Sequence, residues 1–97
     1  MLELVSITKA TDGKHKWVAK FMRDGREKNV PFGGYSYTDF TLGASEDQRE
    51  NYIRRHSNSR ENFNDPTTPA SLSRYILWGP TRSFSENLRL FKRRFGL

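Results

Sequence analysis

The sequence contains no cysteine in its 97 residues. Disulfides, thiolate nucleophiles and thiolate metal ligands are therefore excluded, and the composition fits a reducing compartment. Apolar residues make up 34%, against roughly 45–50% in typical globular chains. No apolar run approaches the ~18 residues of a membrane-spanning helix, and residues 1–10 lack the pattern of a signal peptide. We therefore expect no membrane span and a location in the cytoplasm, the nucleus or a particle assembled there.

Patterns that carry catalysis or metal binding are also missing from the sequence. The two histidines, His15 and His56, lie far apart, and a zinc site needs about four ligands. The carboxylates of Asp39, Asp65 and Glu86 are scattered along the chain. Asp65 precedes a proline and reads as a turn residue, and Glu86 reads as the partner of a helix cap. The sequence thus predicts a non-enzymatic protein that binds no metal and no cofactor.

Charge is the clearest compositional feature that the chain does have. The net charge is +6 and the pI is about 10. Arginines number 11 and lysines 6. A guanidinium is a planar donor that pairs with carboxylate or phosphate and stacks on rings. The balance favours an anionic partner or a protein interface, and it does not choose between them.

The first 32 residues predict an antiparallel sheet. Asp24-Gly25 is a strong signal for a two-residue hairpin turn. Strand side chains alternate between faces, so pairing outward from this turn fixes the residues that share one face. The expected pairs are Phe21 with Lys28, Ala19 with Val30, and Trp17 with Phe32. Five of these six residues are apolar, which specifies the register.

Pro31 determines where the third strand must lie. In this register Pro31 falls opposite Val18, and proline has no N–H to donate to a neighbouring strand. Residues 26–32 must therefore form an edge strand or bulge at the proline. Residues 2–9 are then expected to pair with the free side of residues 15–23, which gives a three-stranded meander.

Residues 33–44 predict an aromatic loop. Gly33-Gly34 ends the strand pattern, and apolar or aromatic residues then recur at alternate or nearly alternate positions: Tyr35, Tyr37, Phe40 and Leu42. A short fourth strand is the alternative. The aromatic side chains are expected to fold back onto the domain.

Two helices are predicted between residues 45 and 78. The helix over 45–57 begins with a capping box, in which Ser45 and Gln48 satisfy each other's backbone donors. The helix over 68–78 begins at Thr68, which is followed by a proline suited to the first helical position.

A third helix is predicted over 82–95. Ser83 and Glu86 form a second capping-box pattern. Its apolar stripe has a clean helical period: Phe84, Leu88, Phe91 and Phe95. The whole chain, 1–97, is therefore expected to be a single α+β domain.

Arginines beside aromatic residues predict an interaction surface. Its candidate members are Arg49, Arg54, Arg55, Arg74, Trp78, Arg89, Lys92, Arg93 and Arg94. Three interpretations stay open: solvated helix faces, phosphate contacts to nucleic acid, and a protein interface with arginines around aromatic anchors. Trp78 could plug the sheet or project toward a partner.

Motifs spread over residues 15–95 carry a resemblance to a known family. They include Val30-x-Phe32-Gly33, Asp39-Phe40-Thr41, Tyr52-Ile53-x-Arg55-His56, Leu72-Ser73-Arg74-Tyr75-Ile76-Leu77-Trp78 and Phe91-x-x-Arg94-Phe95. The chain resembles a family of small uncharacterised proteins encoded by large double-stranded DNA viruses of eukaryotes, of the nucleocytoplasmic type. The resemblance implies a virion protein, present in host cytoplasm or nucleus during assembly.

The resemblance and the charge together suggest two functions. The first is a minor capsid component that glues neighbouring subunits, with other capsid or virion proteins as partners and an oligomeric assembly as its setting. The alternative is a basic nucleic-acid-binding module of the virion or infected nucleus.

Overall fold

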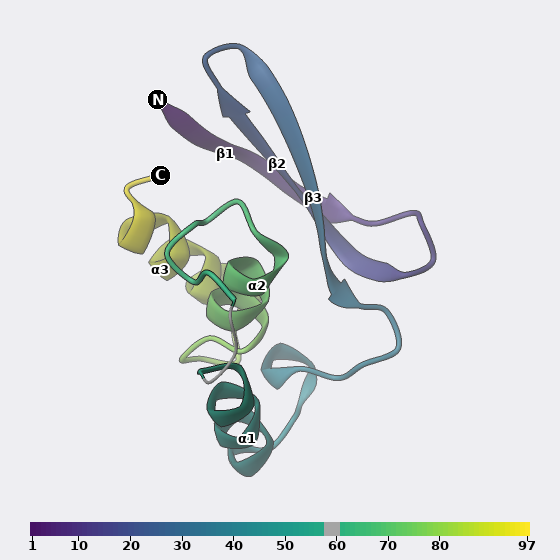
Figure 1. Cartoon of the computed structure of the whole chain (residues 1–97). Helices are drawn as coiled ribbons and strands as arrows, with labels where there is room; N and C mark the ends of the chain where they lie inside the picture. Colours follow the sequence, from purple (N-terminus) through teal and green to yellow (C-terminus); the bar gives the residue numbers. More distant parts are fainter. Residues whose placement is uncertain (58–60) are drawn as a thin grey trace.

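A three-stranded antiparallel sheet begins the chain (Figure 1). Its strands are β1 (Leu2–Lys9), β2 (His15–Arg23) and β3 (Arg26–Gly34), in the spatial order β1-β2-β3. The computed structural model describes residues 1–57 and 61–97. The predicted meander with a central second strand is confirmed. The sheet extends beyond its predicted end at residue 32, because β3 continues through Gly34.

The predicted strand register is confirmed pair by pair. The observed partners include Phe21 with Lys28, Ala19 with Val30, Trp17 with Phe32, and Val18 with Pro31. Asp24 and Gly25 both adopt positive φ angles, 51° and 78°, as a tight two-residue hairpin requires. Since β3 is an edge strand, the missing N–H of its proline leaves no partner strand unsatisfied.

The other elements follow the sheet in sequence. They are a short 3₁₀ helix η1 (Phe40–Leu42), α1 (Glu46–Ser57), α2 (Pro69–Leu72), a π-helical turn η2 (Ser73–Leu77) and α3 (Phe84–Phe95). The α2–η2 segment packs on β3 and α3 packs on η2. Helix α1 lies at the end of the molecule away from both chain termini (Figure 1). The chain therefore folds as a single α+β domain, as predicted.

The hydrophobic core fills the space between the sheet and the C-terminal elements. Its fully buried large side chains are Phe21, Phe32, Leu72, Ile76, Leu77 and Phe91. By contrast, α1 buries no residue completely, so it lies at the surface. A thin core on a few aromatic anchors is what a 97-residue chain of low apolar content can build.

The predicted second helix, 68–78, is two structures joined end to end. Thr68 caps it, accepting a hydrogen bond from the Ser71 N–H. From Ser73 onward the turn widens to a π-helix, and the Trp78 N–H donates to the Ser73 carbonyl at 2.9 Å. The wider turn places Leu77 in the core, which α-helical spacing did not predict.

The segment 33–44 forms no fourth strand. It is an extension of β3, a turn and η1. The expectation that its aromatic side chains fold back is right for Phe40, which is buried, and wrong for Tyr35 and Tyr37, which are 69% and 75% exposed. Edge strand β3 ends at Gly34, because the Tyr37 N–H donates a hydrogen bond to the Gly34 carbonyl and closes a turn there.

The capping prediction is confirmed in full for α1 and in half for α3. Ser45 and Gln48 make both reciprocal bonds of the box. Ser83 Oγ accepts from the Glu86 N–H, but the Glu86 carboxylate pairs with Arg89. Glu86 is therefore not the reciprocal cap that the sequence predicted, because a guanidinium one turn away is a stronger partner for its charge.

A buried asparagine fixes the turn that leads into α3. Asn87 is fully buried, and its amide donates to the carbonyls of Ile76 and Thr81 and accepts from the N–H and hydroxyl of Thr81. Gly79 lies so close that an added Cβ would stand 2.6 Å from the Asn87 Cγ. The turn thus depends on both residues, and it sets the position of Trp78.

Candidate functional site

Residues 35–42, named here the tyrosine loop, are attached to the sheet by the buried carboxylate of Asp39. The Asp39 side chain is 1% exposed and binds the Lys16 ammonium of β2 at 2.8 Å. It also accepts hydrogen bonds from the N–H and the hydroxyl of Thr41. An ionised group this far from water is stable only with such partners, so the loop is pinned to the sheet.

Two guanidinium groups also contact this loop, through the Phe40 ring and nearby carbonyls. Arg82 lies 4.1 Å from the centre of the Phe40 ring and donates to the carbonyls of Phe40 and Ala44. Arg49 lies 5.6 Å from the same ring centre. Because cations are attracted to aromatic faces, the buried ring anchors the loop between α1 and the segment before α3.

Three apolar side chains of this braced loop nevertheless face solvent. Tyr35, Tyr37 and Leu42 are 69%, 75% and 63% exposed. A loop fixed by an ion pair and two guanidiniums gains nothing in stability from exposing rings. Rigid exposed rings are typical of docking residues, because little conformational entropy remains to be lost on binding.

The tyrosine loop separates two hollows. On one side Tyr35 and Leu42 border a depression of about 610 Å³, which also contains the touching rings of Trp17 and Phe84, 4.7 Å apart between centroids. Lys9, His15 and Arg82 lie around it. We name this side the docking face; it combines aromatic surface with a cationic rim.

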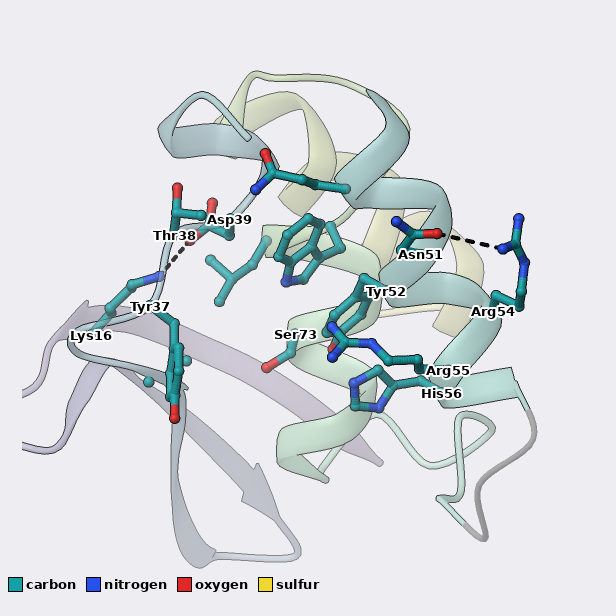
Figure 2. A pocket seen from close by; sticks show the side chains of 15 residues that line it. Lys16, Tyr37, Thr38, Asp39, Asn51, Tyr52, Arg54, Arg55, His56 and Ser73 are labelled. Carbon is teal, nitrogen blue, oxygen red and sulfur yellow. Dashed lines mark hydrogen bonds and ion pairs between the residues drawn. The ribbon is translucent and has the colours of Figure 1, made fainter. Parts of the chain in front are cut away.

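On the other side lies a groove of about 910 Å³ (Figure 2). Its lining comes from the end of β3, the tyrosine loop, α1 and η2, and includes Gly34, Tyr37, Tyr52, Arg55, Ser73 and Trp78. Figure 2 shows Tyr37 on one wall and Arg55 with His56 on the other, with the Ser73 hydroxyl between them. The groove therefore brings together segments far apart in sequence.

A stack of rings forms the α1 wall of the groove. Tyr52 lies parallel to Trp78, with ring centres 4.5 Å apart, and 4.1 Å from the ring of His56. Burial raises the pKa of Tyr52 to about 12, so its phenol stays neutral at physiological pH. His56 also contacts the Glu61 carboxylate at 2.7 Å. The stack fixes Trp78 as a wall residue.

Two of the predicted interaction residues have structural partners. Arg49 Nε donates to the carbonyls of Trp78 and Gly79 at 3.2 and 2.8 Å. Arg74 Nη1 donates to the same Trp78 carbonyl, and burial, followed by the charge of Arg49, lowers the pKa of Arg74. Both arginines thus satisfy carbonyls where η2 ends, where no further helical N–H is available.

Three predicted residues meet at the groove. Trp78, Arg54 and Arg55 all line it. Arg54 turns outward and lies 3.5 Å from the Asn51 side chain, whereas Arg55 reaches over Tyr52 toward the opening (Figure 2). Among residues 1–57 and 61–97, no hydrogen bond or ion pair holds the Arg55 guanidinium.

The remaining predicted residues gather on α3 and do not line the groove. Arg89 pairs with Glu86, and Arg94 lies 4.3 Å from the Tyr75 ring centre and bonds its hydroxyl. Lys92 and Arg93 complete the set near the C-terminal end of the helix, where the helix dipole stabilises positive charge. The nine residues therefore fall into three sets and do not form one surface: two hold the end of η2, three line the groove and four lie on α3.

The sequence reasoning missed the Lys16–Asp39 pair and the exposure of Tyr35 and Tyr37. An available signal was the spacing Asp39-x-Thr41, typical of an aspartate that accepts from the backbone two residues on. Within residues 1–57 and 61–97, no cluster of three or more metal-ligating side chains is present. No helix among them has the length and apolar character needed to cross a membrane.

The fold and its two hollows define a small α+β domain with a cationic surface lined by aromatic residues. The chain belongs to a family whose function is unknown (DUF5754), and the family model matches residues 5–56. The match runs from Val5 within β1 to His56 near the end of α1, so it includes most of the sheet, the tyrosine loop, Arg54 and Arg55. No curated protein and no solved structure matches the chain.

Proposed function

We propose that the protein is a non-enzymatic structural protein, a minor capsid component of a large double-stranded DNA virus that joins neighbouring capsid subunits. The viral setting rests on the sequence resemblance. The observation that carries the docking role is the exposure of Tyr35 and Leu42 on a loop that is otherwise rigidly braced.

The docking face has the chemistry of a protein interface. Tyrosine, tryptophan and arginine dominate the residues that contribute most to binding between proteins. Here Tyr35, Trp17 and Phe84 lie together, with Lys9 and Arg82 at the rim. An apolar patch bordered by acidic side chains on the neighbouring subunit would complement both parts, and a rim of opposite charge would speed association.

A protein that bridges two subunits also needs a second contact surface. Within the part of the chain that the structure describes, the outer edges of β1 and β3 both lack a partner strand. The β1 edge carries a bulge between Leu4 and Ser6, and the Val5 side chain there is exposed. An unpaired edge can add a strand from a neighbouring chain, so contacts at this edge and at the docking face would hold two subunits together.

The test is incorporation into virus particles. In purified particles, quantitative mass spectrometry should find the wild-type chain at a fixed ratio to the major capsid protein, and nuclease treatment should leave that ratio unchanged. A variant with Tyr35→Ser and Leu42→Ser should fall at least about tenfold in incorporation, since each truncated anchor is expected to cost roughly 1–2 kcal/mol.

Arg93→Ala is the control, because Arg93 is exposed and lies outside both hollows. It should enter particles at the wild-type ratio. Absence of the chain from particles, or equal incorporation of the double variant and the wild type, contradicts the proposal.

A further inference from the structure

We propose that the groove binds single-stranded nucleic acid, with a base stacked on Tyr37 and the adjoining phosphate held by Arg55. This site is distinct from the docking face, and it does not depend on the capsid role. The inference rests on the wall that Tyr37 forms, on the charge balance of the groove, and on the polar groups between its walls.

Packing and a backbone hydrogen bond fix the orientation of the Tyr37 side chain, which forms one wall of the groove. Its ring lies against the backbone of Gly34, where an added Cβ would approach the Tyr37 Cδ2 to 2.3 Å. The Tyr37 N–H donates to the Gly34 carbonyl at 3.1 Å and closes the turn. With 75% of the residue exposed, the ring offers a fixed stacking surface. Bases stack on such rings with little regard to sequence, because every base has a flat aromatic face.

The groove carries an excess of positive charge. Its cationic lining residues are Lys16, Arg54 and Arg55, and Asp39 is the acidic residue of the lining. Lys16 and Asp39 neutralise each other at 2.8 Å, and Arg54 turns outward to Asn51 (Figure 2), which leaves the Arg55 guanidinium to attract an anion. Arg55 faces Tyr37 across the opening (Figure 2). One nucleic-acid strand can therefore stack a base on Tyr37 and place the adjoining phosphate at Arg55.

Polar groups between the walls can meet the edge of an unpaired base. The hydroxyl of Ser73 and the amide side chains of Asn51 and Gln48 line the same groove. Unpaired bases present donors and acceptors that such groups recognise. In a duplex the base edges are paired and the base faces are already stacked on one another, so no base face is available to stack on Tyr37. The groove therefore fits a single strand better than a duplex.

The test measures binding to short oligonucleotides in solution. Fluorescence anisotropy at 50 mM salt should show the wild-type protein binding a labelled ten-residue thymidine oligomer at least about tenfold more tightly than a duplex of equal length. Tyr37→Ala should weaken single-strand binding by about fivefold or more, because the stacking surface is lost. Tyr37→Phe keeps the ring and should stay within about twofold of the wild type.

The salt dependence separates the roles of the two walls. Arg55→Ala should reduce the slope of log affinity against log salt by about 0.7, the value for one lost phosphate contact on a single strand. Tyr37→Ala should leave that slope unchanged. Arg93→Ala removes the same charge outside the groove and should change single-strand affinity by less than about twofold. Circular dichroism confirms that each variant is folded.

Several results would overturn the proposal. They are equal affinity for duplex and single strand, unchanged binding by Tyr37→Ala, and an Arg93→Ala loss as large as that of Arg55→Ala. Absence of oligonucleotide binding at 50 mM salt would overturn it as well. None of these results bears on incorporation into particles, so the nucleic-acid site and the capsid role can fail separately.

Discussion

Removing Lys16 from its ion pair with Asp39 should destabilise the fold more than removing Asp39. The Asp39 side chain is 1% exposed, whereas Lys16 is 12% exposed and borders both hollows. A carboxylate left without its cation would have no route to water, but a lysine left alone could swing its ammonium toward solvent. We therefore expect Lys16→Met to cost about 3–5 kcal/mol of unfolding free energy and Asp39→Asn about 1–3 kcal/mol.

The two substitutions complete a double-mutant cycle. Asparagine at 39 keeps a carbonyl oxygen that can accept from the N–H and hydroxyl of Thr41, so the cycle isolates the charge. With both charges removed, the double variant should be more stable than Lys16→Met alone by about 1.5 kcal/mol or more, because no unpaired buried ion remains.

Urea unfolding followed by far-ultraviolet circular dichroism measures all four proteins. Equal m-values across the set would show that each variant unfolds from an equally compact state. Single-variant losses below about 1 kcal/mol, typical of pairs at the surface, would refute the reasoning. So would an additive double variant, because additivity means that the two charges do not interact.

Two further predictions concern the turn into α3 and the response to acid. Asn87→Ala should lower the unfolding free energy by about 2–4 kcal/mol, measured in urea, because four hydrogen bonds to Ile76 and Thr81 are lost from a buried site; a loss below about 1 kcal/mol would contradict this. Hydrogen bonds from the side chain and backbone of Thr67 hold the pKa of Asp65 below its ordinary value. The resulting stability is present above the unfolded-state pKa of roughly 3.9 and is lost as the pH falls through the lower folded-state pKa. Thermal melts between pH 5 and pH 2 should therefore show a shallower decline for Asp65→Asn than for the wild type, and parallel curves would refute the assignment.

The residues predicted for an interaction surface show how the same amino acid can have opposite roles. Arg49 and Arg55 lie on one helix, six positions apart. The first satisfies two carbonyls at the end of η2, and the second faces an open groove. Arginine content near aromatic residues therefore indicated that guanidiniums matter in this chain. Which of them are available to a partner depends on the unpaired carbonyls nearby.

The sequence by itself determined the sheet, the element order and most helix boundaries. These features depend on local rules: a two-residue turn at Asp24 and Gly25, alternation along a strand, and a proline that tolerates only an edge. Ser45 and Thr68 likewise start their helices through bonds to residues three positions away. Each rule needs only neighbours along the chain or one hairpin partner, so the pattern of residues was sufficient.

Only the tertiary structure decided the site. Lys16 and Asp39 are 23 residues apart, and nothing in their surroundings along the chain pairs them. The exposure of Tyr37 follows from a turn against Gly34, although an aromatic residue in a thin-cored protein was expected to be buried. Burial and ion pairing are properties of positions in space, which the packing of β3, the tyrosine loop and η2 creates and which no local pattern contains.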